Sequence, residues 1–265
     1  VMADRLHEIY TTGQSTLTNG EPWYQTYVDY ALENGIVQAG DFTSYTAKAT
    51  RGQMAYLFSR ALPASVLPSI NNVQTLPDVT GSTKYSQEIF SLYNAGVLTG
   101  SDVFGTFKPN DNIIRAEAAA ILTRVALPTQ RKTVVLMKQV QWGVAKLAIP
   151  QSAGAGVTEN GMYTVTSEQH ACGVIATSVT DSAYKGLSVT VLTEQQMNNI
   201  LTQAFNSTDG KLSNAKSTKV SFGSVKAYRT VGILTTDEGA GDCLIFTYIT
   251  GNKMDMICLL AYEND

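Results

Sequence analysis

The stretch IIRAEAAAILTR, residues 113–124, decides the fold of the first half of the chain, because its pattern occurs twice. The earlier copy, ATRGQMAYLFSR at residues 49–60, also places an Arg, a small residue, a Glu or Gln, and an apolar run that ends on a second Arg. In that copy Thr50 and Gln53 have the spacing of a capping box, in which each side chain bonds the other residue's backbone N–H. Each copy therefore predicts a helix that begins at its first Arg.

Length and charge restrict the classes of function. The chain has 265 residues and a net charge of −3, with a sequence pI of about 5.5. No block of Lys and Arg stands out, which argues against a nucleic-acid partner. No apolar run reaches the roughly eighteen residues of a membrane span, and the opening residues lack the pattern of a signal peptide. They are amphipathic and begin without a cap, so we expect the sequence to be a piece of a longer chain.

The first half is built from repeated helix–loop–helix units. WYQTYVDYALENGIV at 23–37 matches KYSQEIFSLYNAGVL at 84–98. Each predicts an amphipathic helix that ends at Gly35 or Gly96, where glycine suits a left-handed C-cap. The expected inner stripes consist of Tyr27, Val28, Ala31 and Leu32 in the first helix and Ile89, Leu92 and Tyr93 in the second. Such a unit buries its apolar stripe only by packing against other units.

Three units are expected in a helical domain at 1–130. The first is present only as its tail at 1–13, the second spans 17–63 and the third 76–128. In this alignment Arg5 falls where Arg60 and Arg124 fall. After residue 130 the composition changes to short alternating runs rich in β-branched residues, Gly and Ser, which predicts a second domain at 135–265.

The second domain is expected to be α+β, with a mainly antiparallel sheet. The pattern predicts extended segments at 143–150, 162–167, 171–179 and 186–192, and longer strand runs at 218–234 and 243–262. Thr193 and Gln196 form a capping box before a helix at 193–206, whose inner stripe is Met197, Ile200, Leu201 and Phe205. Gly251 and Asn252 lie between two alternating segments and predict a two-residue hairpin turn.

Two interpretations are open for the repeated Arg. A cation is mildly unfavourable at the start of a helix, so Arg51 and Arg115 need another role. One role is an anion pocket, made by free helix N–H groups and the guanidinium fork. In the other, both arginines pair with acidic residues of neighbouring units and only hold the units together.

A family resemblance extends over residues 1 to about 127. The third unit supplies five elements in order: Asp78-Val79, Gly96-Val97, Gly100, Phe107-x-Pro109 and Arg115-Ala116-Glu117. In this it resembles the S-layer homology repeat. The second unit keeps Trp23, Gly35-Ile36 and Thr50-Arg51 but departs elsewhere, with Gly52-Gln53 where the family has Ala-Glu.

The resemblance implies a helical repeat bundle of pseudo-threefold symmetry. It also implies binding of an acidic, often pyruvylated, secondary cell-wall polysaccharide or another peptidoglycan-linked glycan, which would place the protein at the outer surface of a bacterial cell wall. The glycan-binding residues carried over are Trp23, Arg51, Asp78, Gly100, Arg115 and Glu117. On the residues alone, Trp23 is either a sugar-stacking aromatic or a staple that holds its helix to the core.

The second domain carries only weak signals for chemistry. His170 and Cys172 are expected on one face of a strand, but no third residue is visible to orient them, so a buried Cys beside a His is the alternative to a catalytic pair. The order of strands and helix loosely resembles the PsbP/Mog1-like sandwich. We therefore expect a non-catalytic binding or scaffold domain without cofactor or metal, with a cell-wall-associated enzyme as the alternative.

The three cysteines, Cys172, Cys243 and Cys258, form no C-x-x-C motif, which argues against a zinc site. The hairpin at Gly251-Asn252 places Cys243 opposite Leu260 and Cys258 opposite Ile245. The two cysteines are then diagonal neighbours, about 7–8 Å apart, which is too far for a disulfide. We expect three free, buried thiols.

Overall fold

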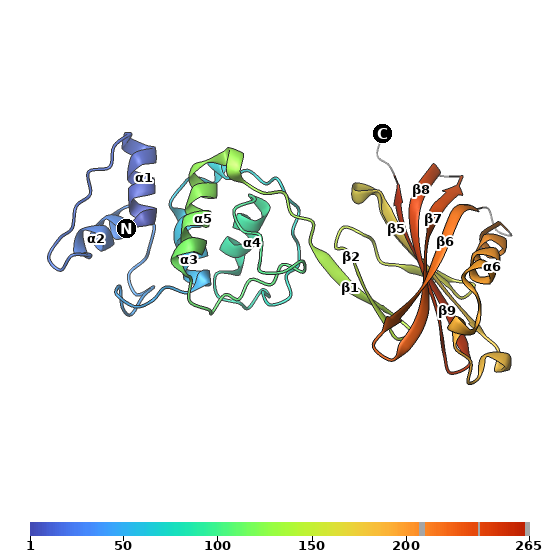
Figure 1. Ribbon diagram of the computed structural model, residues 1–265. Coiled ribbons are helices and arrows are strands. Elements are labelled where there is room, and N and C mark those ends of the chain that lie inside the picture. The colour runs from blue at the N-terminus through green and yellow to red at the C-terminus, as the bar shows by residue number, and fades with distance from the viewer. Residues whose placement is uncertain (207–209, 238, 263–265) are drawn as a thin grey trace. The chain divides into compact units, whose positions relative to one another are not determined.

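The computed structural model describes residues 1–206, 210–237 and 239–262. Contacts between Cα atoms divide the chain into two units, Val1–Met137 and Lys138–Asp265. The first is helical and the second is built on a sheet (Figure 1). Among the described residues, no helix combines the length and the hydropathy that crossing a membrane would require.

Five α-helices form the first unit. They are α1 (Met2–Thr12), α2 (Gln25–Glu33), α3 (Arg51–Arg60), α4 (Ser86–Asn94) and α5 (Arg115–Ala126), with short 3-10 turns η1 (Ala64–Val66) and η2 (Pro128–Gln130). Both α3 and α5 begin at the Arg that the repeated pattern predicts. The capping box of α3 is confirmed, because Thr50 Oγ1 accepts from Gln53 N at 3.2 Å and Gln53 Oε1 accepts from Thr50 N at 2.8 Å.

The two helix–loop–helix units close in the same way. Gly35 follows α2 and Gly96 follows α4, and both have the predicted left-handed backbone, with φ of 67° and 73°. Arg60, in the last turn of α3, donates to the carbonyl of Gly35 at 3.0 Å. Arg124 of α5 donates to the carbonyl of Val97, also at 3.0 Å. Each second helix is thus tied to the end of its first helix.

Arg5 does not repeat this contact. It lies early in α1 and donates to the hydroxyl of Tyr27 at 2.9 Å and to the carbonyl of Leu17 at 3.3 Å. The alignment of Arg5 with Arg60 and Arg124 therefore does not extend to their hydrogen bonds, because α1 continues seven residues beyond Arg5 to Thr12.

The core of the first unit contains the predicted stripe of α4. Ile89, Leu92 and Tyr93 are fully buried. The stripe of α2 is narrower than predicted: Tyr27 and Ala31 are buried, whereas the side chain of Leu32 is 38% exposed. Periodicity locates the inner face of a helix but does not set its width, and Leu32 lies at the edge.

The second unit contains two sheets. Strands β1 (Met137–Trp142) and β2 (Ala145–Pro150) form a two-stranded sheet. The larger sheet has the order β3-β4-β5-β9-β8-β7-β6, and its described strand pairs are all antiparallel. Its strands are β3 (Val157–Glu159), β4 (Met162–Ser167), β5 (Cys172–Thr180), β6 (Lys211–Phe222), β7 (Val225–Thr236), β8 (Gly239–Thr250) and β9 (Lys253–Tyr262). The predicted α+β class with an antiparallel sheet is confirmed for this unit.

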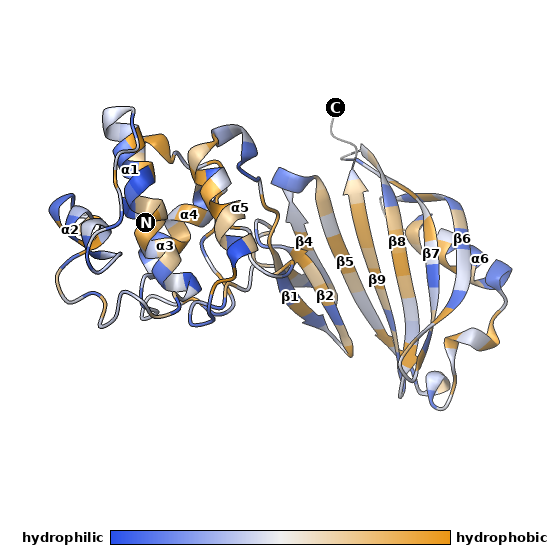
Figure 2. Ribbon diagram, turned by 60° about the vertical axis from the view of Figure 1, so that its left-hand side comes forward, coloured by the Kyte–Doolittle hydropathy of each residue, from blue (hydrophilic) through white to orange (hydrophobic). Residues whose placement is uncertain are grey.

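Each face of the large sheet has its own cover. Helix α6 (Glu194–Asn206) packs on one face through Met197, Leu201 and Phe205. The β1–β2 hairpin covers the other face, where Ile149 and Ala153 join a second buried cluster. The central strands β5, β9 and β8 are the most hydrophobic (Figure 2). Both covers explain why the centre of the sheet is apolar on both sides.

Three expectations about the helix and strands of this unit are corrected. Residues 186–192 are not extended but form the turn η5 (Val189–Val191), where the Ser188 hydroxyl accepts from the backbone N–H of Thr190. The run 218–234 is two strands that turn at Gly223, whose φ is 59°. Ile200 is 40% exposed, outside the buried stripe of α6. The capping box at Thr193 and Gln196 is confirmed.

The predicted hairpin register is confirmed at the cysteines. Cys243 lies opposite Leu260 and Cys258 opposite Ile245. All three cysteines are free thiols, and Cys243 and Cys258 are buried. Cys172 was also expected to be buried but is half-buried, because it begins β5 directly after an exposed turn.

Candidate functional site

Arg51 links the second and third helix–loop–helix repeats, both of which lie in the first unit. Its Nε donates to the carbonyl of Phe107 at 2.6 Å, and its guanidinium lies 5.0 Å from the centre of the Phe107 ring. One guanidinium N–H also pairs with the carboxylate of Glu117 in α5. The Arg51 side chain is only 12% exposed. Of the two interpretations of the repeated Arg, an anion pocket and pairing between repeats, the second describes Arg51.

The other interpretation, an anion pocket, does not describe the start of α3. The backbone N–H of Arg51 donates to the carbonyl of Asp111 and that of Gly52 to the carbonyl of Pro109, both at 2.9 Å. The next N–H is taken by the Thr50 cap. The loop at 107–111 therefore occupies the position that an anion would need.

Asp78 and Gly100 support the same loop. The Asp78 carboxylate accepts from the backbone N–H groups of Phe107 at 2.9 Å and Lys108 at 2.6 Å. Gly100 has a φ of 77°, and a Cβ there would lie 2.7 Å from the Cα of Gly105. Both residues thus hold the backbone near Phe107 in place, and neither contact needs a ligand.

Arg115 is different from Arg51, although both begin a helix in the same motif. Its side chain is exposed. Within the described residues, no hydrogen bond or ion pair reaches its guanidinium or the backbone N–H groups at 115–117. Glu117 accepts from the backbone N–H of Ile114 at 3.1 Å in addition to pairing with Arg51. Of the two motif arginines, Arg115 is the one left available to an anion.

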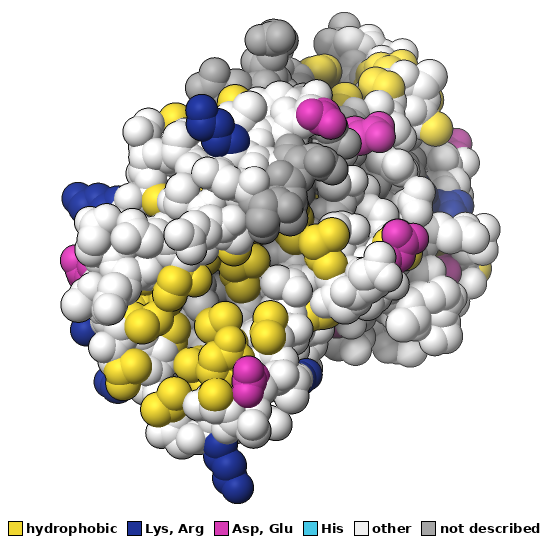
Figure 3. Space-filling view, turned by 90° about the vertical axis from the view of Figure 1, so that its right-hand side faces the viewer, with side chains coloured by type: hydrophobic (Ala, Val, Ile, Leu, Met, Phe, Trp, Pro, Cys, Tyr) yellow, Lys and Arg dark blue, Asp and Glu magenta, His cyan; other side chains and the backbone are white. Residues whose placement is uncertain are grey.

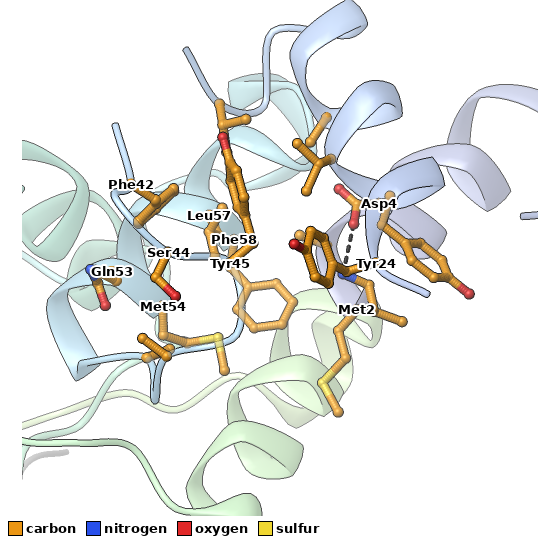
Figure 4. A pocket seen from close by; sticks show the side chains of 18 of the residues that line it. Met2, Asp4, Tyr24, Phe42, Ser44, Tyr45, Gln53, Met54, Leu57 and Phe58 are labelled. Atoms are coloured by element: carbon orange, nitrogen blue, oxygen red, sulfur yellow. Dashed lines mark ion pairs between the residues drawn. The ribbon is translucent and has the colours of Figure 1, made fainter. Parts of the chain in front are cut away.

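Trp23 lines a pocket of about 290 Å³ in the first unit. Side chains converge on it from α1, from α2 and the residues just before it, from the loop after α2 and from α3 (Figure 4). Its aromatic lining consists of Trp23, Tyr24, Tyr27, Phe42, Tyr45 and Phe58. Trp23 is 51% exposed and Tyr45 is 39% exposed, so both rings remain open to a ligand.

The charges at this pocket are unequal. Asp4 lines it but is buried and pairs with the amino group of Val1 at 2.6 Å (Figure 4). Lys48 also lines it, is exposed, and has no ion pair among the described residues. The pocket therefore offers aromatic faces beside the exposed ammonium of Lys48.

The buried phenol of Tyr56 lies beside the pocket, with its ring centre 6.3 Å from that of the lining residue Phe42. The Tyr56 hydroxyl donates to Asp41 at 2.5 Å, and Arg60 lies 5.0 Å from the centre of the Tyr56 ring. Burial, together with this hydrogen bond, raises the pKa of Tyr56 to about 12. Burial alone would raise the pKa of Asp41, but the bonds from Tyr56 and the Gln38 backbone hold that pKa below its usual value.

His170 and Cys172 do not form a pair. His170 ends the turn η3 (Glu168–His170), and its Nδ1 contacts the hydroxyls of Ser152 at 2.8 Å and Ser167 at 3.3 Å. Burial raises the pKa of the Cys172 thiol, which opposes formation of a thiolate nucleophile. In the described part of the chain, no cluster of His, Cys, Asp and Glu is arranged to hold a metal ion.

The aromatic pocket and Lys48 were not predicted. Trp23 is the only one of the six predicted glycan-binding residues that lines the pocket. The available signal was the spacing of Phe42, Tyr45 and Lys48 in the loop DFTSYTAK at 41–48, which places two aromatic rings and a cation just before the Thr50-Arg51 motif. Arg51 and Glu117 instead join the second and third helix–loop–helix repeats. Asp78 and Gly100 support the backbone at 105–108 inside the third repeat.

The first unit is thus a helical domain in which the loop at 107–111 packs on the start of α3. Residues 75–119 match the family model of the S-layer homology domain. The chain therefore contains an S-layer homology domain, which implies association with the cell wall or cell surface.

Other comparisons add little. No curated protein sequence matches the chain. Among solved structures, the chain is similar to the solution structure of cyanobacterial PsbP (CyanoP) from Synechocystis sp. PCC 6803, with 11% identity and a TM-score of 0.37. That match covers 44% of this chain, in its C-terminal part, and 74% of the other chain. A likeness of this size supports no statement about function.

Proposed function

We propose that the first unit binds an acidic secondary cell-wall polysaccharide and so holds the protein at the outer surface of a bacterial cell wall. The observation that carries this proposal is the pocket in which the exposed rings of Trp23 and Tyr45 lie with Lys48. Aromatic rings offer a flat apolar face to the C–H side of a sugar. An unpaired ammonium attracts a carboxylate on the same glycan, including the carboxylate of a pyruvate ketal.

Arg115 is the second contact in this proposal. It lies within the matched S-layer homology segment and has an exposed side chain. Its position beside unbonded N–H groups at the start of a twelve-residue helix adds to the attraction for an anion. A polymer with repeated acidic sugars can meet Lys48 and Arg115 with different residues of its chain.

We further infer that the units form a repeat bundle. The support is a similar placement of two loops: the loop at 107–111 bonds the start of α3, and the loop at 42–49 lines the same pocket as the first residues of α1. In this arrangement each loop packs on a helix of the preceding helix–loop–helix repeat. This is expected for repeats that cannot bury their apolar stripes alone.

The second unit acts in this proposal as a non-catalytic binding or scaffold domain displayed by the first. The support is that His170 is engaged with two serines while the Cys172 thiol is disfavoured as a thiolate. Among the described residues no hydrogen bond joins His170 to Cys172, which supports this role for the second unit.

Sedimentation with purified cell-wall sacculi tests the proposal. The protein should sediment with intact sacculi and remain in solution when the non-peptidoglycan polymer has been removed. Trp23→Ala and Lys48→Gln should each weaken sedimentation about tenfold or more, because each removes one of the two recognition elements. Tyr10→Ala is the matched control, since Tyr10 is a 49% exposed aromatic on α1 that does not line the pocket. Equal sedimentation with stripped sacculi would contradict the proposal.

A further inference from the structure

The second unit contains a separate cavity of about 420 Å³ on the face that carries α6. Its floor is the large sheet, and its walls are α6 and the segment 184–192. Hydrophobic side chains gather around a hollow on this face (Figure 3). The volume lies in the range of about 300–1,000 Å³ that is typical of small-molecule sites.

The strand register builds the floor. Thr247 of β8 lies opposite Met256 of β9, which lies opposite Thr177 of β5. Two residues along, Ile249 lies opposite Met254 in the same way. Because side chains alternate between faces, these residues share the face on which α6 packs. Helix α6 covers the neighbouring part of that face, at Ile245 and Cys258, and leaves this end open.

Of the two threonines on this floor, Thr177 and Thr247, Thr247 is the buried one. It is only 3% exposed, and its hydroxyl has no hydrogen-bond partner among the described residues. Buried hydroxyls are normally hydrogen-bonded, because burial without a partner is unfavourable. The same sheet shows the normal case, since the buried hydroxyls of Thr230 and Ser217 bond each other at 2.7 Å. Because Thr247 also lines the cavity, a molecule bound there is placed to supply the partner that this hydroxyl lacks.

The lining restricts the chemistry of that partner. None of the described lining residues is charged, so a charged ligand would lose its hydration without compensation. Three methionines, Met197, Met254 and Met256, supply flexible side chains that adapt to aliphatic chains. The rim is apolar as well, with Val191 69% exposed and Leu187 49% exposed.

We infer that this cavity binds a neutral aliphatic molecule with a single hydroxyl or carbonyl oxygen, which forms a hydrogen bond with Thr247. A flat protein surface laid over Val191 and Leu187 would cover the rim but leave the Thr247 hydroxyl unpaired at the floor. A narrow chain that enters the cavity satisfies both the apolar walls and the hydroxyl. The inference does not depend on glycan binding by the first unit.

Calorimetric titration of the full protein with 1-octanol tests this inference. Saturable binding to one site is expected, and octanoate at pH 8 should bind at least tenfold more weakly because the cavity has no cation. Thr247→Val should weaken octanol binding about tenfold, and Thr247→Ser should restore it. The unliganded Thr247→Val protein should melt at the same or a higher temperature, because it loses an unpaired buried hydroxyl.

Thr230→Val is the matched control. It should leave octanol binding unchanged but lower the melting temperature, because the hydroxyl of Ser217 loses its partner. Absence of saturable binding to the unmodified protein, or equal affinity of the Thr247→Val variant, would overturn the inference. Concentration-dependent dimerisation that octanol does not affect and that Val191→Lys abolishes would assign the cavity to a second copy of the chain and would also overturn it.

Discussion

Arg51 and Glu117, 66 residues apart in the chain, pair across two helices of the first unit. Each residue belongs to one copy of the repeated motif: Arg51 begins α3, and Glu117 lies in the first turn of α5. Arg51 also donates to the carbonyl of Phe107, so it contacts both the helix and the loop of the next unit. The motif Arg was expected to bind the glycan. In the second helix–loop–helix repeat it instead joins that repeat to the third.

Arg51→Ala should lower the free energy of unfolding of the first unit by about 2 kcal/mol. The ion pair contributes little of this, because Glu117 is 40% exposed. Most comes from the charge-assisted bond to the Phe107 carbonyl, in a place where Arg51 is mostly buried. Denaturant unfolding followed by circular dichroism measures the change. Arg115→Ala is the control and should leave stability unchanged while it weakens sedimentation with sacculi; equal destabilisation by the two variants would refute the assignment of separate roles.

Gly100→Ala should destabilise the first unit by more than Gly35→Ala. Both glycines have a left-handed backbone, with φ of 77° and 67°, so both substitutions carry a conformational cost of about 1 kcal/mol. A Cβ at Gly35 has no atom within 4 Å, whereas one at Gly100 would lie 2.7 Å from the Cα of Gly105. Only Gly100→Ala should also displace the loop at 107–111. Equal melting temperatures for the two variants would show that this close approach does not matter.

Tyr56 should make the stability of the first unit depend on pH in alkaline solution. Burial and the hydrogen bond to Asp41 raise its pKa to about 12, while an unfolded tyrosine has a pKa of about 10. The folded protein therefore keeps the phenol proton where the unfolded chain loses it, and stability present below pH 10 declines as the pH rises towards 12. Tyr56→Phe should make this decline shallower, as measured by melting temperature against pH. An unchanged slope, with exposed Tyr10→Phe as reference, would exclude Tyr56 as the cause.

The cysteines should react as three free thiols once the protein is denatured without reductant. In the folded protein Cys258 should not react, because its hydrogen bond with Cys243 and its burial raise the pKa of its thiol. Half-buried Cys172 should react first, although slowly. Titration with a thiol reagent before and after denaturation measures both. A count of one thiol after denaturation would mean that two of the three cysteines form a disulfide and that the hairpin register or the strand assignment is different.

Local patterns in the sequence predicted local structure well. The capping boxes at Thr50 and Thr193 and the left-handed Gly35 and Gly96 depend on residues within one turn of each other. The hairpin register at Gly251-Asn252 follows from a two-residue turn and alternation. Each of these features is set by chain neighbours, so spacing alone identifies it.

Contacts between distant segments could not be predicted in the same way. The anion pocket at α3 failed because the carbonyls of Pro109 and Asp111, nearly sixty residues away, fill it. The turn at Val189–Val191 was mistaken for a strand because β-branched residues favour strands, while the cap from Ser188 decides the outcome locally. The pocket around Trp23 combines residues of four segments, and no periodicity in any one of them reveals it.

The emission of Trp23 during titration with the released wall polymer tests the central claim most directly. The chain has two tryptophans, Trp23 and Trp142. In the Trp142→Phe variant the second unit has no indole, so all tryptophan emission comes from Trp23. If the polymer covers the half-exposed Trp23 ring, its emission should shift to shorter wavelength and saturate, and Lys48→Gln should weaken the apparent affinity about tenfold. Saturable sedimentation with sacculi accompanied by no change in Trp23 emission would contradict binding at this pocket.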